Sequence, residues 1–495
     1  MEHYLIMNPS GFPLLSTTIF LPVLGVMAIL FMKNDGLIKL TALLVSLATF
    51  LVSLLVYFQF DQGTHLFQFG EFLPWIPKYE INYLLGIDGI TVFLIPLTTL
   101  IAPLCVLTSW KAIETRVKEF MICILLMETA MVGVFCALDF VLFYLFWEAM
   151  LIPMYLLIAI WGGPRKDYAS IKFFIYTLFG SVFLLVALIA IYLHNGTFNI
   201  AEAMFRDYSF TFQFWVFLAF GIAFAIKVPM FPFHTWLPAA HTEAPTAGSV
   251  FLASILLKMG AYGFLRFSLP ITPEASVFAA PYVIALSLIA IVYGGYVCLS
   301  QTDMKKLIAY SSVAHMGFVT LGIFTFTMFG FRGAMLQILN HGITTGALFC
   351  CVGIVYERTH SREIYDNAGL GKIMPIYMGF FGLFAISSFA FPGTNNFISE
   401  LYILIGAFGA GKLIGFITIV GALLAAAYML KLLKQIAWGR TDNRPNLVDM
   451  NFREIAYLLP LALFVFWVGL FPKPFVAAME NTLSFYQARL EQFIP

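Results

Sequence analysis

Long apolar runs recur along the whole chain and are separated by short segments that carry most of its charged residues. Of 495 residues, 61% are hydrophobic and only 11% are charged, whereas a soluble domain carries about 25% charged residues. A membrane-spanning helix needs about 20 consecutive apolar residues, and we count fourteen such runs. The alternating segments of membrane barrels do not occur in the sequence. The sequence therefore predicts an all-α, polytopic membrane protein with about 14 transmembrane helices and the lipid bilayer as its surroundings.

Basic residues are distributed unevenly between the predicted loops. Odd-numbered loops and their flanks, including Arg440 and Arg444, hold 18 Lys and Arg residues, whereas even-numbered loops and the C-terminal segment, including Arg266, hold seven. The remaining two, Lys227 and Lys258, lie inside spans. By the positive-inside rule the odd loops face the cytoplasm, so both termini are expected outside. The first span is expected to be retained because the start, MEHYLIMNPS, lacks the basic region of a cleavable signal.

The sequence contains no pattern that would hold a cofactor. All six cysteines lie inside apolar spans, and none forms a C-x-x-C pair. Iron–sulfur and zinc spacings, dinucleotide-binding glycines and a P-loop are also absent. The net charge of +1 gives no sign of a nucleic-acid partner. We therefore expect no cofactor, no metal site and no nucleic acid on this chain.

Two spans are interrupted in similar ways. Span 7 contains Pro229 and Pro232, and span 12 contains Pro392 and Gly393; each proline removes a backbone hydrogen-bond donor. Aligning Ala225-Ile226 with Ala385-Ile386 brings Pro232 onto Pro392. Because the breaks lie five spans apart, and an odd-numbered unit must insert in the opposite orientation when repeated, spans 4–8 and 9–13 are predicted to be inverted repeats. The predicted units are 1–117 (helices 1–3), 118–267, 280–436 and 437–495 (helix 14).

Discontinuous helices at corresponding places in two halves indicate a transport site. Irregular backbone at that depth is tolerated only where it lines a cavity or is covered by protein. The alternative is a pair of unrelated proline kinks, which are common in membrane helices. The ionisable residues beside both breaks favour the transport site.

Glu148 and Lys227 are the first predicted pair of buried charges. Glu148 lies in the apolar run 140–161, and Lys227 lies two residues before Pro229. A charge at the bilayer centre costs about 3 kcal/mol on insertion scales. Burial favours the neutral form of each group, and mutual attraction restores the charged forms. A change in their separation would therefore make Lys227 hold or release its proton, and carbonyls freed at the break could also solvate it. The alternative is a static salt bridge that orders two helices.

Lys258 and Glu400 are further ionisable groups in apolar surroundings. Lys258 lies in the middle of its span, too far from either end for its ammonium to reach water easily, and its alternative role is a pairing for packing only. Glu400 follows the second break and is a predicted terminal proton acceptor opening toward the outside. Its alternative role is a cap on the second half-helix.

Four histidines complete the set. His315 and His341 lie in spans 10 and 11 beside small or polar residues, and a histidine exchanges protons near neutral pH. The alternative for each is a hydrogen-bonded core histidine. His234 and His241 are placed on the loop side between spans 7 and 8, near water.

These segments resemble the antiporter-like subunits of respiratory complex I, and the resemblance covers almost the whole chain. The most specific stretches are FWEAMLIPMYLLI around Glu148 and KVPMFPFHTWLPAAHTEAPTAGSVFLASILLKMG, which holds Lys227 and Lys258. DMKKLIAYSSVAHMG, LNHG and PGTNNFISE add to it. The glutamate at position 400 resembles the chain M type of these subunits (chain 4 in mitochondria and chloroplasts), because chains L and N typically carry lysine at the corresponding position. Chain L also has a long lateral helix after its last span, which is not expected here.

The resemblance implies proton transfer through Glu148, Lys227, Lys258, the histidines in spans 10 and 11, and Glu400. It implies a place in the bacterial inner membrane or an equivalent energy-transducing membrane, with chains of the L and N type on either side. Flavin, iron–sulfur clusters and quinone are expected in the partner subunits of an NADH:quinone oxidoreductase.

Other interpretations stay open at this point. Ferredoxin-, reduced-deazaflavin- and formate-linked complexes share this type of subunit, and cation/proton antiporters are related to it. A membrane redox subunit that binds haem or quinone through its histidines is a different class of function. Haem ligation needs facing histidines in a four-helix arrangement, whereas His315 and His341 each stand among small residues.

Overall fold

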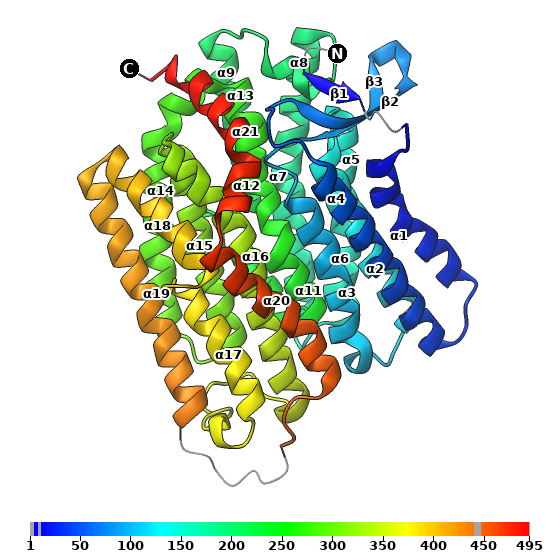
Figure 1. Cartoon of the computed structure of the whole chain (residues 1–495), viewed down its shortest axis with the longest axis vertical. Helices are drawn as coiled ribbons and strands as arrows, with labels where there is room; N and C mark the ends of the chain where they lie inside the picture. The colour runs from blue at the N-terminus through cyan, green and yellow to red at the C-terminus, as the bar shows by residue number, and fades with distance from the viewer. Residues whose placement is uncertain (1–3, 8–10, 440–446, 495) are drawn as a thin grey trace.

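Both chain ends and a small group of strands lie at the same end of a bundle of long helices (Figure 1). The computed structural model describes residues 4–7, 11–439 and 447–494. Arg440 and Arg444, which were counted with the odd loops, lie outside the described residues. Within the described part, twelve helices are long and apolar enough to cross a membrane. The shorter α1 and the interrupted pair α17 and α18 bring the total to the predicted fourteen spans.

The first part of the chain contributes three spans and a sheet that the all-α prediction did not include. β2 and β3 form an antiparallel hairpin, and β1 pairs in parallel with β2. The elements are β1 (Leu5–Met7), α1 (Leu14–Leu30), α2 (Asp35–Gln59), β2 (Phe67–Ile76), η1 (Pro77–Tyr79), β3 (Ile81–Ile87) and α3 (Leu94–Ala112).

The next five spans include two that are irregular. Span 5 is divided at Met150, just after Glu148, and span 8 contains two π-helical turns, η2 and η3, on either side of Lys258. Such turns often occur at functional sites. The elements are α4 (Val117–Cys136), α5 (Phe140–Ala149), α6 (Leu151–Trp161), α7 (Lys166–Asn195), α8 (Ile200–Met204), α9 (Phe210–Lys227), α10 (Trp236–Glu243), α11 (Thr246–Phe251), η2 (Leu252–Leu256), α12 (Leu257–Gly263), η3 (Phe264–Ser268) and α13 (Leu269–Ile271).

The remaining spans are followed by a helix that the sequence analysis did not predict. This helix, α21, runs along the end of the bundle that carries the strands (Figure 1). The elements are α14 (Pro273–Ser300), α15 (Met304–Phe324), α16 (Met328–Thr359), η4 (Leu370–Lys372), α17 (Pro375–Ser388), α18 (Asn395–Ala410), α19 (Lys412–Trp438), α20 (Phe452–Leu470) and α21 (Lys473–Glu491).

The two helix breaks occur where the prolines predicted them. The first separates α9 from α10 and contains Pro229 and Pro232; the second separates α17 from α18 and contains Pro392 and Gly393. Gly393 has a φ of 89°, which is open to glycine because it has no Cβ. When Pro232 is placed on Pro392, the end of α9 falls within one residue of the end of α17, and the start of α10 falls within one residue of the start of α18. The predicted discontinuity of helices 7 and 12 is confirmed.

Glycines bring the helices of the bundle centre into close contact. The apolar windows of α16 and of the span 246–271 are entirely buried. A Cβ on Gly333 of α16 would lie 2.6 Å from the backbone nitrogen of Ile403 in α18, and one on Gly342 would lie 2.8 Å from the carbonyl oxygen of Ser254. Larger residues at these positions would therefore separate α16 from both neighbours.

Arg266 was counted with the even-numbered loops, but it lies inside span 8. Its guanidinium donates two hydrogen bonds to Asp88, at 2.6 and 2.8 Å, and one of 2.7 Å to the hydroxyl of Tyr486 in α21. Both members of the ion pair are nearly inaccessible, with side-chain exposures of 1% and 2%. A buried charge becomes tolerable when it is paired and hydrogen-bonded in this way, and the partner lies far away in the sequence.

Asp88→Ala should lower the free energy of unfolding by about 3–5 kcal/mol, because it leaves the guanidinium of Arg266 buried without a counter-charge. The measurement is thermal or denaturant unfolding of the purified chain in detergent. Glu119→Ala is the control, because the Arg116–Glu119 pair is about half exposed and should contribute less than about 1 kcal/mol. Equal effects of the two substitutions would contradict the assignment.

Candidate functional site

Four ionisable side chains from four helices follow one another at the bundle centre. The Nζ of Lys258 in α12 lies 2.6 Å from the Nδ1 of His341 in α16. The rings of His341 and His315 have centroids 5.7 Å apart. The Nδ1 of His315, in α15, lies 3.2 Å from an Oε1 of Glu400 in α18. The structure therefore brings together residues that the sequence placed in four different spans.

The π-helical turn η2 helps to hold Lys258. The ammonium donates a hydrogen bond to the carbonyl of Ala253, within that turn. With His341 as a second acceptor, two of the three donors of the ammonium have partners. The buried amine of Lys258 is thus hydrogen-bonded without a carboxylate partner. It can exchange a proton with His341 beside it.

The Glu400 end of the series is surrounded by polar side chains. Gln337 donates to the Oε1 of Glu400 at 3.3 Å, and the other carboxylate oxygen has no hydrogen-bond partner. The Nε2 of His315 lies 3.3 Å from the hydroxyl of Tyr428 and 3.4 Å from that of Ser388. His315 thus has partners on both ring nitrogens, which supports proton transfer through the ring.

The second helix break is held by a hydrogen-bond network beside this series. Asn340 donates to the backbone carbonyl of Asn395 at 2.8 Å, and Ser387 donates to the side-chain oxygen of Asn395 at 2.6 Å. The hydroxyl of Thr344 lies 2.9 Å from that of Ser387. These bonds satisfy polar groups at the start of α18 and hold Glu400, one and a half turns further on, beside His315.

Glu148 and Lys227 are both present in the interior but are not in contact. One oxygen of Glu148 and the Nζ of Lys227 are buried without a hydrogen-bond partner. The ammonium lies 5.0 Å from the ring centre of Trp147, the residue before Glu148. Such a cation–π contact is worth about 2 kcal/mol or more when it is desolvated. Glu148 still acts on Lys227 electrostatically, so the pair is separated but coupled.

The expected solvation of Lys227 by carbonyls freed at the first break is wrong. The indole nitrogen of Trp236 donates to the carbonyl of Ile226, and the backbone nitrogen of Met230 donates to that of Ala225, each at 2.8 Å. The chain turns back at the break, and these two carbonyls accept hydrogen bonds from Trp236 and Met230 and not from the ammonium of Lys227.

His234 and His241 are buried, which corrects their expected place near water. His241 is fully buried, and neither of its ring nitrogens has a hydrogen-bond partner. His234 is 3% exposed, and its ring lies against Phe231 and Tyr293. Both belong to the segment that turns back into the bundle after the first break, which hydropathy alone does not reveal.

Glu128 and Trp147 were not among the site residues predicted from the sequence. Glu128 lies in α4, is completely buried, and has no hydrogen-bond partner on either oxygen within the described part of the chain. A carboxylate in the middle of an apolar span is the signal that could have identified it. Trp147 carries no such signal, because an aromatic residue in an apolar span is ordinary.

The geometry also bears on the haem alternative. Both ring nitrogens of His315 have protein partners, and the Nδ1 of His341 faces Lys258. Ligation of a metal by His315 would break one of its contacts, whereas the Nε2 of His341 has no hydrogen-bond partner among the described residues. The arrangement favours a relay of protons.

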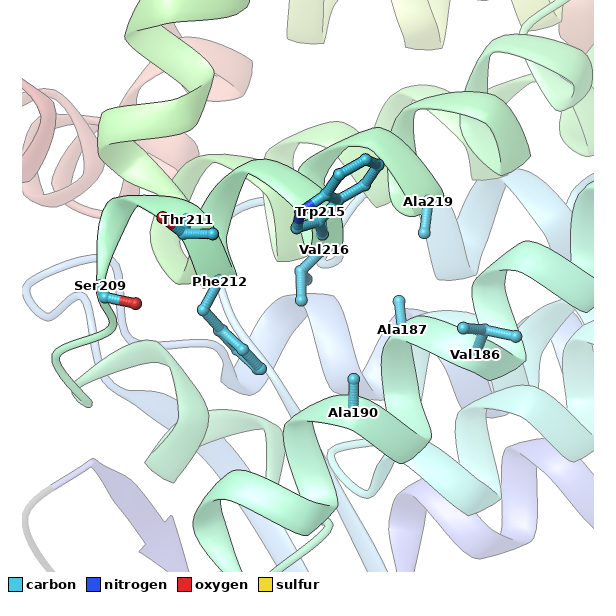
Figure 2. Close-up of a pocket in the computed structure, with 9 residues that line it drawn as sticks. All are labelled: Val186, Ala187, Ala190, Ser209, Thr211, Phe212, Trp215, Val216 and Ala219. Carbon is cyan, nitrogen blue, oxygen red and sulfur yellow. The ribbon is translucent and has the colours of Figure 1, made fainter.

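An apolar cavity at the rim of the bundle differs in character from the central series. It has a volume of about 380 Å³ and lies between α7 and α9, where the side chains of the two helices face one another (Figure 2). Its apolar walls are Val186, Ala187, Ala190, Phe212, Trp215, Val216 and Ala219. It contains no ionisable group and is not part of the site.

The chain is similar to known proteins in both sequence and fold. Two family models match the chain: NADH-ubiquinone oxidoreductase chain 4, amino terminus, over 17–134, and NADH:quinone oxidoreductase/Mrp antiporter, TM, over 137–425. NADH-ubiquinone oxidoreductase chain 4 of Chondrus crispus is 43% identical and is covered over 99% of both chains. NADH-quinone oxidoreductase subunit M of Rhodobacter capsulatus is 46% identical, with 93% of each chain covered.

Solved structures agree. A chain of respiratory complex I from Thermus thermophilus with bound NADH has a TM-score of 0.89 and 29% identity, covering 96% of this chain and 99% of that one. A chain of the archaeal membrane-bound sulfane sulfur reductase has a TM-score of 0.85 at 22% identity, a likeness in fold alone. The fold and the buried ionisable groups define an antiporter-like membrane protein. The chain belongs to the NADH:quinone oxidoreductase/Mrp antiporter family, in its chain 4 (subunit M) branch.

His341→Ala should lower the melting temperature of the detergent-solubilised protein, because it removes a hydrogen bond of Lys258. A hydrogen bond to a charged group contributes about 1.5–3 kcal/mol. His341→Gln, which restores an acceptor in the same region, should recover part of the loss. Melting followed by circular dichroism distinguishes the variants, and an unchanged melting temperature for His341→Ala would contradict the contact.

Proposed function

We propose that this chain translocates protons as a membrane-arm subunit of a respiratory NADH:quinone oxidoreductase. The observation that carries the proposal is the series Lys258, His341, His315 and Glu400. Its two ends are joined at hydrogen-bond distances of 2.6 and 3.2 Å, and the rings of its two histidines have centroids 5.7 Å apart. The hydrogen-bonded pairs at the two ends can pass protons between their members without large movements. The relatives named for this enzyme support the assignment of the reaction.

The separated pair of Glu148 and Lys227 supplies the switch. When Lys227 approaches Glu148, attraction favours the ammonium; when the two are apart, burial favours the neutral amine. The ammonium also has the Trp147 ring as a resting position. Movement between the two positions would change its tendency to hold a proton, which a pump requires. The full set is Glu148, Lys227, Lys258, His315, His341 and Glu400.

The wider assignment follows the family. Both termini are placed outside by the distribution of basic residues, in the bacterial inner membrane or an equivalent membrane. The five-helix units 118–267 and 280–436 act as the two inverted repeats, and chains of the L and N type lie on either side. NADH oxidation, flavin, iron–sulfur clusters and quinone belong to partner subunits, and this chain contributes proton transfer alone.

Glu148→Ala and Lys227→Ala should each reduce proton pumping at least tenfold, because either change removes one member of the coupled pair. Pumping is measured as acidification of inside-out membrane vesicles during NADH oxidation, with assembly checked by native electrophoresis. Lys412→Ala is the control, since this lysine is exposed at the start of α19. Normal pumping by an assembled Glu148→Ala or Lys227→Ala variant would refute the assignment.

Trp147→Leu should reduce the pumping rate several-fold, whereas Trp147→Phe should retain most of it. Leucine removes the π-face that faces the Lys227 ammonium, and phenylalanine keeps a weaker one. The same vesicle assay applies, with NADH oxidation by uncoupled membranes as the measure of intact electron transfer. Equal rates for the two variants would show that volume alone matters at this position.

A further inference from the structure

We propose that His241 is the proton acceptor at the inner end of the route, behind a water-accessible vestibule. The inference rests on the proposed function, which does not say where protons leave the inner aqueous phase. Three independent features of the structure meet at this residue: a charged cavity, an aromatic wall and an unpartnered imidazole.

The vestibule is a cavity of about 630 Å³ between the α3–α4, α6–α7 and α10–α11 connections and the end of α16. These connections are odd-numbered loops, so the proposed orientation places the opening on the inner side. Ionisable side chains line it, among them Glu114, Glu243, Lys305, Glu357 and Arg362. A cavity lined by side chains of both charge signs does not repel protons as a purely basic one would.

Phe349 separates the vestibule from His241. Its ring belongs to the cavity lining and stacks on the imidazole with centroids 4.4 Å apart and an angle of 11° between the planes. His241 is therefore covered by one aromatic ring at the cavity wall. A rotation of that ring would uncover the face of the imidazole on which it stacks.

The imidazole itself is unusual for a buried residue. His241 is fully buried, yet neither Nδ1 nor Nε2 has a hydrogen-bond partner among the residues that the structure describes. Leaving a buried polar group unpaired costs about 1–3 kcal/mol, so a purely structural histidine at this position would be a poor choice. With both nitrogens free, the ring can take a proton on one and release the proton of the other.

A polar path continues from His241 toward the central series. His341 and Phe349 are eight residues apart on α16, or about 12 Å along the helix, and Thr345 lies between them on the same face. Ser254 donates to the carbonyl of Gly342 at 2.8 Å, and its hydroxyl occupies the space that a Cβ on Gly346 would need. The hydroxyl of Ser254 therefore lies against α16 between the levels of His341 and Phe349, and Thr345 lies at the same level of the helix. The proton received by His241 passes to the neutral form of His341 or Lys258.

The inverted arrangement of the two breaks gives a second line of support. The offset that brings Pro232 onto Pro392 also brings Ala240 onto Glu400, so His241 lies one residue from the counterpart of Glu400. Glu400 is the proposed outer acceptor, one and a half turns into the half-helix α18. His241 occupies the corresponding place in α10, and the opposite orientation of the repeats turns it toward the inner side.

His241→Phe tests the assignment, because phenylalanine preserves the stack on Phe349 and removes both nitrogens. Proton pumping in inside-out vesicles should fall at least tenfold, while NADH oxidation by uncoupled membranes is retained. His65→Phe is a matched control: His65 is exposed and stacks on Phe485 with centroids 4.6 Å apart and a 12° angle. Unchanged pumping by His241→Phe overturns the proposal. If Glu148→Ala also pumps normally, the proposed function fails as well; if only His241→Phe does, the inlet alone is wrong.

A second experiment does not depend on the folding of the histidine variant. Thr115→Cys places a thiol at the rim of the vestibule, and the six native cysteines are buried. A bulky, membrane-impermeant maleimide added to inside-out vesicles should label this thiol and slow pumping several-fold. A failure to label, or labelled vesicles that pump at the unlabelled rate, would overturn the inlet.

Discussion

The removal of ionisable side chains from water is the constraint on which the bundle centre depends. An unpaired charge in the interior costs several kcal/mol, so partners from other helices stabilise the ionisable groups of the central series. Lys258 finds one in His341, and Glu400 finds others in His315 and Gln337. These contacts require α12, α15, α16 and α18 to meet at one place. The glycines of α16 make that meeting possible, because a Cβ on Gly333 or Gly342 would collide with the neighbouring backbone.

Local signals in the sequence were enough to predict the spans, both breaks and the ionisable groups of the central series. A proline in an apolar run and a charge between apolar residues are visible without knowledge of the fold. The partners of these groups were harder to predict. The carbonyl of Ile226 is taken by the side chain of Trp236, ten residues further on, because the first break turns the chain back. Because that turn belongs to the tertiary structure, the partner of this carbonyl could not be predicted from local sequence signals.

Residues near predicted span ends were misjudged for a related reason. Arg266 and His241 each lie close to a boundary set by hydropathy, so both were placed near water, and both are buried. The burial of Arg266 depends on Asp88 and Tyr486, which are distant in sequence. The hairpin of β2 and β3 and the helix α21 were missed because they do not span the membrane, and a search for long apolar runs passes over such elements.

The two helix breaks share a backbone plan but carry different side chains. With Pro232 placed on Pro392, Lys227 corresponds to Ser387, which is hydrogen-bonded to Asn395 beside the second break. The first break therefore holds an ionisable group that is separated from Glu148, whereas the second holds a network of hydrogen-bonded neutral groups. A hydrogen-bonded network resists rearrangement, whereas the ammonium of Lys227 has no hydrogen bond to break among the described residues. The first half is thus suited to sensing and changing charge, and the second to conducting the proton onward to Glu400.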